Sequence, residues 1–125
     1  EGQLQVKLGK KVHHLLPGKS AMAAPNINHL FRNRSGKPCK FRVELRPASR
    51  GFEQSLQIGY GLAGDGLCKS NGFPKDKFAL AWLFGISESN LPGWRSIFEN
   101  ILYRQAKKAI QKGIDKKLIE KYVRF

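Results

Sequence analysis

The chain has 125 residues, of which 41% are hydrophobic, so it suits one domain over residues 1–125 and is not a disordered tail. Lysine and arginine total 23 and aspartate and glutamate 9, which gives a net charge of +14. This excess opposes compaction through self-repulsion, and a dense polyanion such as nucleic acid would relieve it.

The N-terminal segment predicts one or two strands. Residues 3–8, "QLQVKL", alternate between apolar and polar side chains, which predicts a half-buried strand with Gln5 and Lys7 facing solvent. "KKVHHLL" resumes this strand after a glycine, and the same alternation then places His14 on the inward face and His13 on the outward one. "PGKSAMAAPNIN" follows as a loop.

Two further alternating segments stand in the middle of the chain. "KFRVELRP" and "SLQIGYGL" are separated by the turn-like "PASRG", so residues 39–47 and 55–62 are predicted to form an antiparallel hairpin. Its solvent face would carry the basic residues Lys40, Arg42 and Arg46.

Two helical patterns follow. "FPKDKFALAWLFG" predicts a buried helix that starts near Pro74 and ends at Gly85. From Phe98 onward apolar residues recur every four positions, and a basic row displaced by two positions lies about 200° away around a helix. This cationic row is Arg104, Lys108, Lys112 and Lys116. Gly113 leaves open one long helix with a weak point or two helices, the second capped by Asp115.

These segments together predict an α+β fold. An antiparallel sheet from the N-terminal strands and the central hairpin would be packed by the buried helix and the long C-terminal amphipathic helix. Two cysteines without metal-ligand spacing favour reduced thiols, and no cofactor is expected.

The segment "PGKS" does not make a nucleotide-binding loop. A Walker loop needs an earlier glycine at the position that His13 occupies, so Lys19 is only a candidate phosphate contact. No apolar run approaches the roughly 20 residues of a membrane span, and no signal peptide is recognisable. The start at Glu1 rather than Met suggests a processed or excised segment, and the location in the cell stays open.

The three histidines of the chain are candidate catalytic residues of a nuclease. "VHHLLP" resembles the opening strand of His-Me finger nucleases, which implies His14 as the base that activates water and Asn26 or Asn28 as the orienting amide. The match is incomplete, because no histidine follows His29 to complete the family's metal site, so the family is not assigned.

A second catalytic hypothesis needs no metal. His14 or His13 together with His29, beside a cation, would supply the proton transfers of RNA cleavage. In the simpler interpretation His14 makes a hydrogen bond in the core and His13 joins the basic surface. No acidic pair suggests two-metal chemistry, and a divalent metal is expected only if the chain is a nuclease.

The function that we predict from the sequence is binding to the phosphate backbone of RNA or DNA, largely independent of base sequence, as in a packaging or ribonucleoprotein component. Phe31 and Tyr103 are candidates to stack on bases. The predicted contacts are Lys19, Arg32, Arg34, Lys37, Lys40, Arg42, Arg46, Arg104, Lys108, Lys112 and Lys116.

Two alternatives remain. One is a small toxin-type nuclease that uses His14 with His13 or His29 and would need an acidic inhibitor protein in its producer. The other is a domain that binds an acidic protein or an anionic membrane surface.

Overall fold

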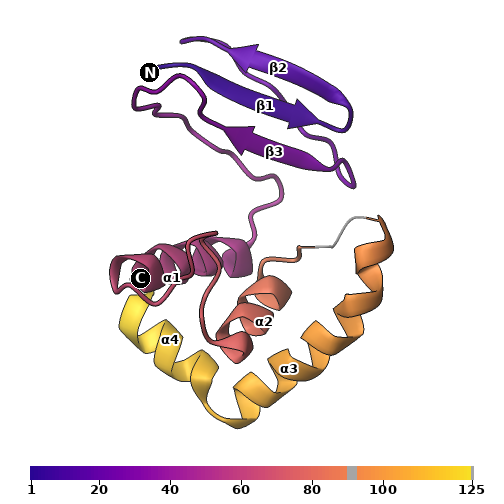
Figure 1. Ribbon diagram of the computed structural model, residues 1–125, viewed down its shortest axis with the longest axis vertical. Helices are drawn as coiled ribbons and strands as arrows, with labels where there is room; N and C mark the ends of the chain where they lie inside the picture. The colour runs from indigo at the N-terminus through magenta and orange to yellow at the C-terminus, as the bar shows by residue number, and fades with distance from the viewer. Residues whose placement is uncertain (90–92, 125) are drawn as a thin grey trace. The chain divides into compact units, whose positions relative to one another are not determined.

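The computed structural model describes residues 1–89 and 93–124, and it divides into two compact units, Glu1–Glu44 and Leu45–Phe125. The first unit holds a three-stranded antiparallel sheet and the second holds helices (Figure 1). The predicted α+β class is therefore confirmed. The prediction of one domain over 1–125 placed no boundary near residue 44.

The sheet of the first unit has the order β2-β1-β3. Its strands are β1 (Leu4–Leu8), β2 (Lys11–Leu15) and β3 (His29–Arg32). The half-buried strand predicted at residues 3–8 is confirmed as the central strand β1, in which Leu4 and Val6 are 6% and 3% exposed. Burying them drives this sheet together, because apolar area removed from water is the main favourable term in folding.

The hairpin from β1 to β2 reverses the predicted facing of the two histidines. A two-residue loop joins the strands, with Gly9 at a φ of 57°, a left-handed conformation that glycine adopts readily. In this register Val6 pairs with His13, and Gln5 pairs with His14. Paired residues share a face of the sheet, so His13 lies on the buried face of β1 and His14 on the other. The prediction of His14 inward was therefore wrong, because it assumed one continuous strand.

The predicted central hairpin is also wrong. Residues 39–45 form no strand, and residues 55–62 lie inside the helix α1 (Arg50–Gly64). Ser49 caps this helix, because its hydroxyl accepts a hydrogen bond from the Phe52 amide at 3.2 Å. Alternation and helical spacing both fit "SLQIGYGL", and the buried pair is Ile58 and Leu62, which are four residues apart on one helix face.

The predicted buried helix is present as α2 (Lys77–Ile86). Its start is set by Asp76, whose carboxylate accepts hydrogen bonds from the amides of Phe78 and Ala79 at 2.7 and 2.9 Å. Pro74 is buried just before this cap. The core of the second unit is formed by Ile58, Leu62, Trp82, Leu83 and Ala109.

The C-terminal segment forms two helices that meet near Gly113, and not one long helix with a weak point. A 3-10 helix, η1 (Gly93–Phe98), leads into α3 (Glu99–Gln111), and α4 (Ile114–Tyr122) follows a break. Gly113 makes the break with a φ of 67°. Asp115 lies in the first turn of α4 but does not cap it, since Gly113 occupies the cap position without a side-chain hydrogen bond.

The end of α4 is tied to the end of α1. Asp65 accepts hydrogen bonds from the Tyr122 hydroxyl at 2.6 Å and from the Lys121 ammonium at 2.7 Å. Gly61 lets the Tyr122 ring approach, because a Cβ at this position would overlap the ring. The glycines of "GYGLAG" thus belong to a helix, and one of them serves helix packing.

We expect acid to weaken this link. The hydrogen bonds from Lys121 and then from Tyr122 lower the pKa of Asp65 below its ordinary value of 3.8. The stabilisation by Asp65 is therefore complete above that value and is lost as pH falls through the lower folded-state pKa. In urea unfolding followed from pH 6 to pH 2, Asp65→Asn should remove part of the pH dependence below pH 4. Superimposable profiles for the variant and the parent would contradict this link.

Candidate functional site

One face of the sheet gathers polar and basic side chains. The register aligns His14, Gln5 and Arg32 in one row across the three strands. Val12, Lys7 and Leu30 form the next row. We call this surface the basic face, and it comprises Gln5, Lys7, Val12, His14, Leu30 and Arg32 with Gln3, Arg34 and Ser35 at the strand ends.

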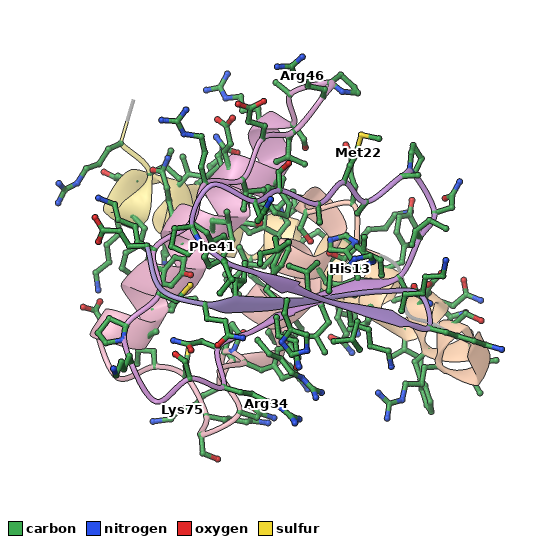
Figure 2. The ribbon with its side chains drawn as sticks, turned by 90° about the horizontal axis from the view of Figure 1, so that it is seen from above. His13, Met22, Arg34, Phe41, Arg46 and Lys75 are labelled. Carbon is green, nitrogen blue, oxygen red and sulfur yellow. The ribbon has the colours of Figure 1, made fainter. Side chains whose placement is uncertain are left out.

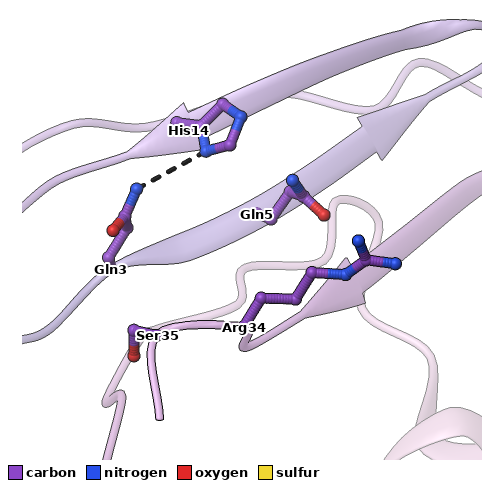
Figure 3. A pocket seen from close by; sticks show the side chains of 5 residues that line it. All are labelled: Gln3, Gln5, His14, Arg34 and Ser35. Atoms are coloured by element: carbon purple, nitrogen blue, oxygen red, sulfur yellow. Dashed lines mark hydrogen bonds between the residues drawn. The ribbon is translucent and has the colours of Figure 1, made fainter. Parts of the chain in front are cut away.

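The basic face is hollowed. Two open hollows of about 280 and 220 Å³ lie on it, and both are lined by Gln5 and Arg34. In Figure 3 the side chains of Gln5, His14 and Arg34 border the first hollow, with Ser35 at its rim. Because both hollows are lined by Gln5 and Arg34, they lie next to each other on the basic face.

The electrostatics of this surface are one-sided. Neither hollow is lined by an aspartate or glutamate. Lys7, Arg32 and Arg34 form no ion pair with any residue that the structure describes. The unit that contains them has nine basic and two acidic side chains. The basic face therefore presents uncompensated positive charge to solvent.

A tight turn fixes the backbone around Arg34. The Asn33 carboxamide accepts a hydrogen bond from the Ser35 amide at 3.0 Å and donates one to the Lys37 carbonyl at 2.6 Å. Such a side-chain-stabilised turn is typical of asparagine. It holds Arg34 two residues beyond the end of β3, where it lines the first hollow together with Gln3 and Gln5. Arg34 therefore adds a second guanidinium group beside that of Arg32 on the basic face.

The sheet does not bring the three histidines together. His14 lies on the basic face, whereas His13 and His29 lie on the opposite face, paired with Val6 and Leu8. With β1 between them and an offset of two residues, the Cα atoms of His13 and His29 are about 12 Å apart. The predicted catalytic pairs of His14 with His13 and of His14 with His29 are therefore divided between the two faces of the sheet.

The surroundings of the histidines are those of ordinary sheet residues. His29 lies 3.1 Å from the Ile27 carbonyl, and its ring is 5.7 Å from that of Phe31. The Gln3 amide nitrogen lies 3.5 Å from Nδ1 of His14, at the outer limit of a hydrogen bond. Within residues 1–89 and 93–124, no group of three or more histidine, cysteine, aspartate or glutamate side chains could hold a metal.

The other predicted contacts of the N-terminal half do not share one face. Lys19 lies in the exposed loop of residues 16–28, where the 86% exposed Met22 points away from the strands (Figure 2). Lys40 follows the turn and exchanges backbone hydrogen bonds with Glu1 at 2.8 and 2.9 Å. Since the central hairpin is absent, it cannot align Lys40, Arg42 and Arg46 on one strand face.

The predicted cationic row is divided by the break at Gly113. Arg104 and Lys108 lie on α3 and are exposed, whereas Lys116 lies on α4. Lys112 follows α3, and its ammonium is 5.2 Å from the centre of the Phe78 ring. The row therefore does not continue along one helix axis.

The aromatic residues expected to stack on bases have partners in the protein. Phe31 lies on the buried face of the sheet, with its ring centre 5.6 Å from that of Phe41. The Lys107 ammonium lies 4.6 Å from the centre of the Tyr103 ring, which is 62% exposed. The basic face itself is lined by no aromatic ring other than the His14 imidazole.

Sequence reasoning missed six members of the site, which are Gln3, Gln5, Lys7, Val12, Leu30 and Ser35. The alternation of "QLQVKL" already placed Gln5 and Lys7 on the solvent face. The alternation does not show that this strand pairs with β3. That pairing brings Gln5 and Lys7 to the same face as Arg32.

No protein-family model, curated protein or solved structure matches this chain. Among the described residues, no helix is both long and apolar enough to cross a membrane.

Proposed function

We propose that this protein binds the phosphate backbone of nucleic acid through the basic face of its sheet. The observation that carries the proposal is that Lys7, Arg32 and Arg34 line two adjoining hollows on one face of the sheet, and that no carboxylate lines either hollow. Guanidinium groups suit phosphate oxygens, because their planar N–H donors match two oxygens at once.

The overall charge supports the same partner. With a net charge of +14, the chain gains free energy when a polyanion releases its condensed counterions. The second unit contributes its own excess, fourteen basic and seven acidic side chains over residues 45–125. Such a protein would suit a packaging or ribonucleoprotein complex, and Arg104 and Lys108 on α3 would add secondary contacts.

The nuclease alternative receives less support from the arrangement of the histidines. A two-histidine mechanism needs both rings within hydrogen-bond reach of one phosphate group. His14 lies on the other face of the sheet from His13 and His29. We therefore favour binding without cleavage.

The proposal predicts a steep salt dependence of binding. If three cations of the basic face each neutralise one phosphate, the logarithm of the association constant should fall with the logarithm of salt concentration with a slope of about −2.7 on duplex DNA. Fluorescence anisotropy with a labelled 20-base-pair duplex between 50 and 300 mM NaCl measures this slope. A slope near zero, or no binding at 50 mM NaCl, would exclude backbone binding.

The same mixtures test for cleavage. Labelled DNA and RNA should stay intact after incubation with the protein, with Mg²⁺ and with a chelator. Degradation that His14→Ala abolishes would establish the nuclease alternative in place of binding alone.

A further inference from the structure

Along β1, the side chains of the basic face recur at about twice the spacing of the base pairs of DNA. Gln3, Gln5 and Lys7 follow one another at every second residue along or beside β1, about 6.8 Å apart. Arg32 ends the neighbouring strand β3, and Arg34 follows two residues later in the turn beyond it. Bases of one DNA strand are about 3.4 Å apart along the axis, so each step on the protein spans two base pairs.

The dimensions of the sheet favour one groove. The major groove of B-DNA is about 12 Å wide and accepts a two-stranded β-ribbon. The neighbouring strands β1 and β3, about 4.8 Å apart, form such a ribbon and carry Gln5, Lys7 and Arg32. The major groove of A-form RNA is too narrow for side chains to read. A single strand would need a stacking platform, and the basic face is lined only by the small His14 ring.

Gln5 stands at the centre of this surface with an unused amide. It lies between His14 and Arg32 in the middle row of the sheet. Its side chain forms no hydrogen bond with any residue in the described part of the chain. A glutamine amide can donate to N7 and accept from N6 of adenine in the major groove, where both atoms are exposed.

The next inference rests on the proposed function, and these observations favour double-stranded DNA as the nucleic acid that is bound. We propose that the basic face enters the major groove of double-stranded DNA, with Gln5 at a base edge and Arg32 and Arg34 on the flanking phosphates. The phosphate contacts supply most of the affinity, and Gln5 adds a preference for adenine at one position.

The first test compares nucleic acids of one sequence. Duplex DNA, duplex RNA and single-stranded DNA compete for the intact protein at 100 mM NaCl, together with a DNA duplex in which 7-deazapurines replace the purines. The 7-deaza duplex keeps the phosphates and the minor groove but lacks the N7 acceptors. We expect the unmodified DNA duplex to bind about tenfold more tightly than each of the others.

The second test removes the glutamine. Selection from a duplex pool with a randomised centre should enrich adenine at one position with the parent protein, and Gln5→Ala should abolish that enrichment while the salt slope stays unchanged. Gln111→Ala is the matched control, since this exposed glutamine at the end of α3 lies outside the basic face. The control should behave as the parent does.

The outcomes separate the two proposals. Equal binding of duplex RNA, single strands or 7-deaza DNA, with a steep salt slope, would overturn the major-groove inference and leave backbone binding in place. Enrichment that survives in Gln5→Ala would overturn the role of Gln5. If no nucleic acid binds at all, the proposed function fails and the inference fails with it.

Discussion

Replacing Arg32 and Arg34 together by glutamate is expected to weaken nucleic-acid binding by about 100-fold or more at physiological salt. Both guanidinium groups line the hollowed basic face and form no ion pair with any described residue, so they are available to phosphates. The loss of two phosphate contacts should also make the salt slope on duplex DNA less steep by roughly 1.8. Anisotropy titrations over the same salt range measure both quantities.

A second double variant provides the matched comparison. Lys108→Glu with Lys112→Glu lowers the net charge by the same amount but acts on the divided cationic row of the helical unit. Because Lys112 follows the end of α3 and its ammonium is placed over the Phe78 ring, we expect a loss of less than about tenfold. Equal losses in the two variants would mean that net charge, and not the basic face, determines binding.

The largest effect on stability is expected for Ile58→Ala. Ile58 is the only fully buried large side chain of the described residues, with an exposed fraction of 0%. Truncating it removes buried apolar area and leaves a cavity beside Leu62, Trp82 and Leu83, so the free energy of unfolding should fall by about 2–5 kcal/mol. Urea unfolding followed by tryptophan fluorescence measures this change, since Trp82 belongs to the same core.

Leu56→Ala is the control on the same helix. Leu56 is 45% exposed, and its truncation should cost less than about 1 kcal/mol. The comparison also tests the correction to the fold, because Leu56 and Ile58 would share one face of a β-strand but lie on different faces of α1. Equal losses from the two truncations would support the strand and contradict the helix.

Two elements were predicted from the sequence, the first by its alternation and the second by the Pro and Gly that flank an apolar segment. The strand at residues 3–8 and the buried helix around Trp82 are both present. The segment at residues 55–62 was misassigned, because its four apolar residues alternate and also form two pairs with helical spacing, Leu56 with Tyr60 and Ile58 with Leu62. The Ser49 cap and the packing against α2 and α4 stabilise the helix. Neither can be recognised from the eight residues of this segment alone.

The candidate site was predicted in part. Arg32, Arg34 and His14 were named from the sequence, and the structure places all three around the basic face. The facing of His13 and His14 depends on the length of the loop at Gly9, since a two-residue hairpin makes odd residues pair with even ones. The contribution of Lys7 depends on the pairing of β1 with β3, a long-range register that alternation alone does not reveal.

The central claim, that the basic face is the surface that meets nucleic acid, is tested most directly by NMR titration of the intact protein with a short DNA duplex. We expect the largest shift changes at the amides of Gln5, Lys7 and Arg32 and at the guanidinium of Arg34, with smaller changes on α3. Changes confined to residues 45–125, with these four residues unaffected at saturation, would contradict the claim.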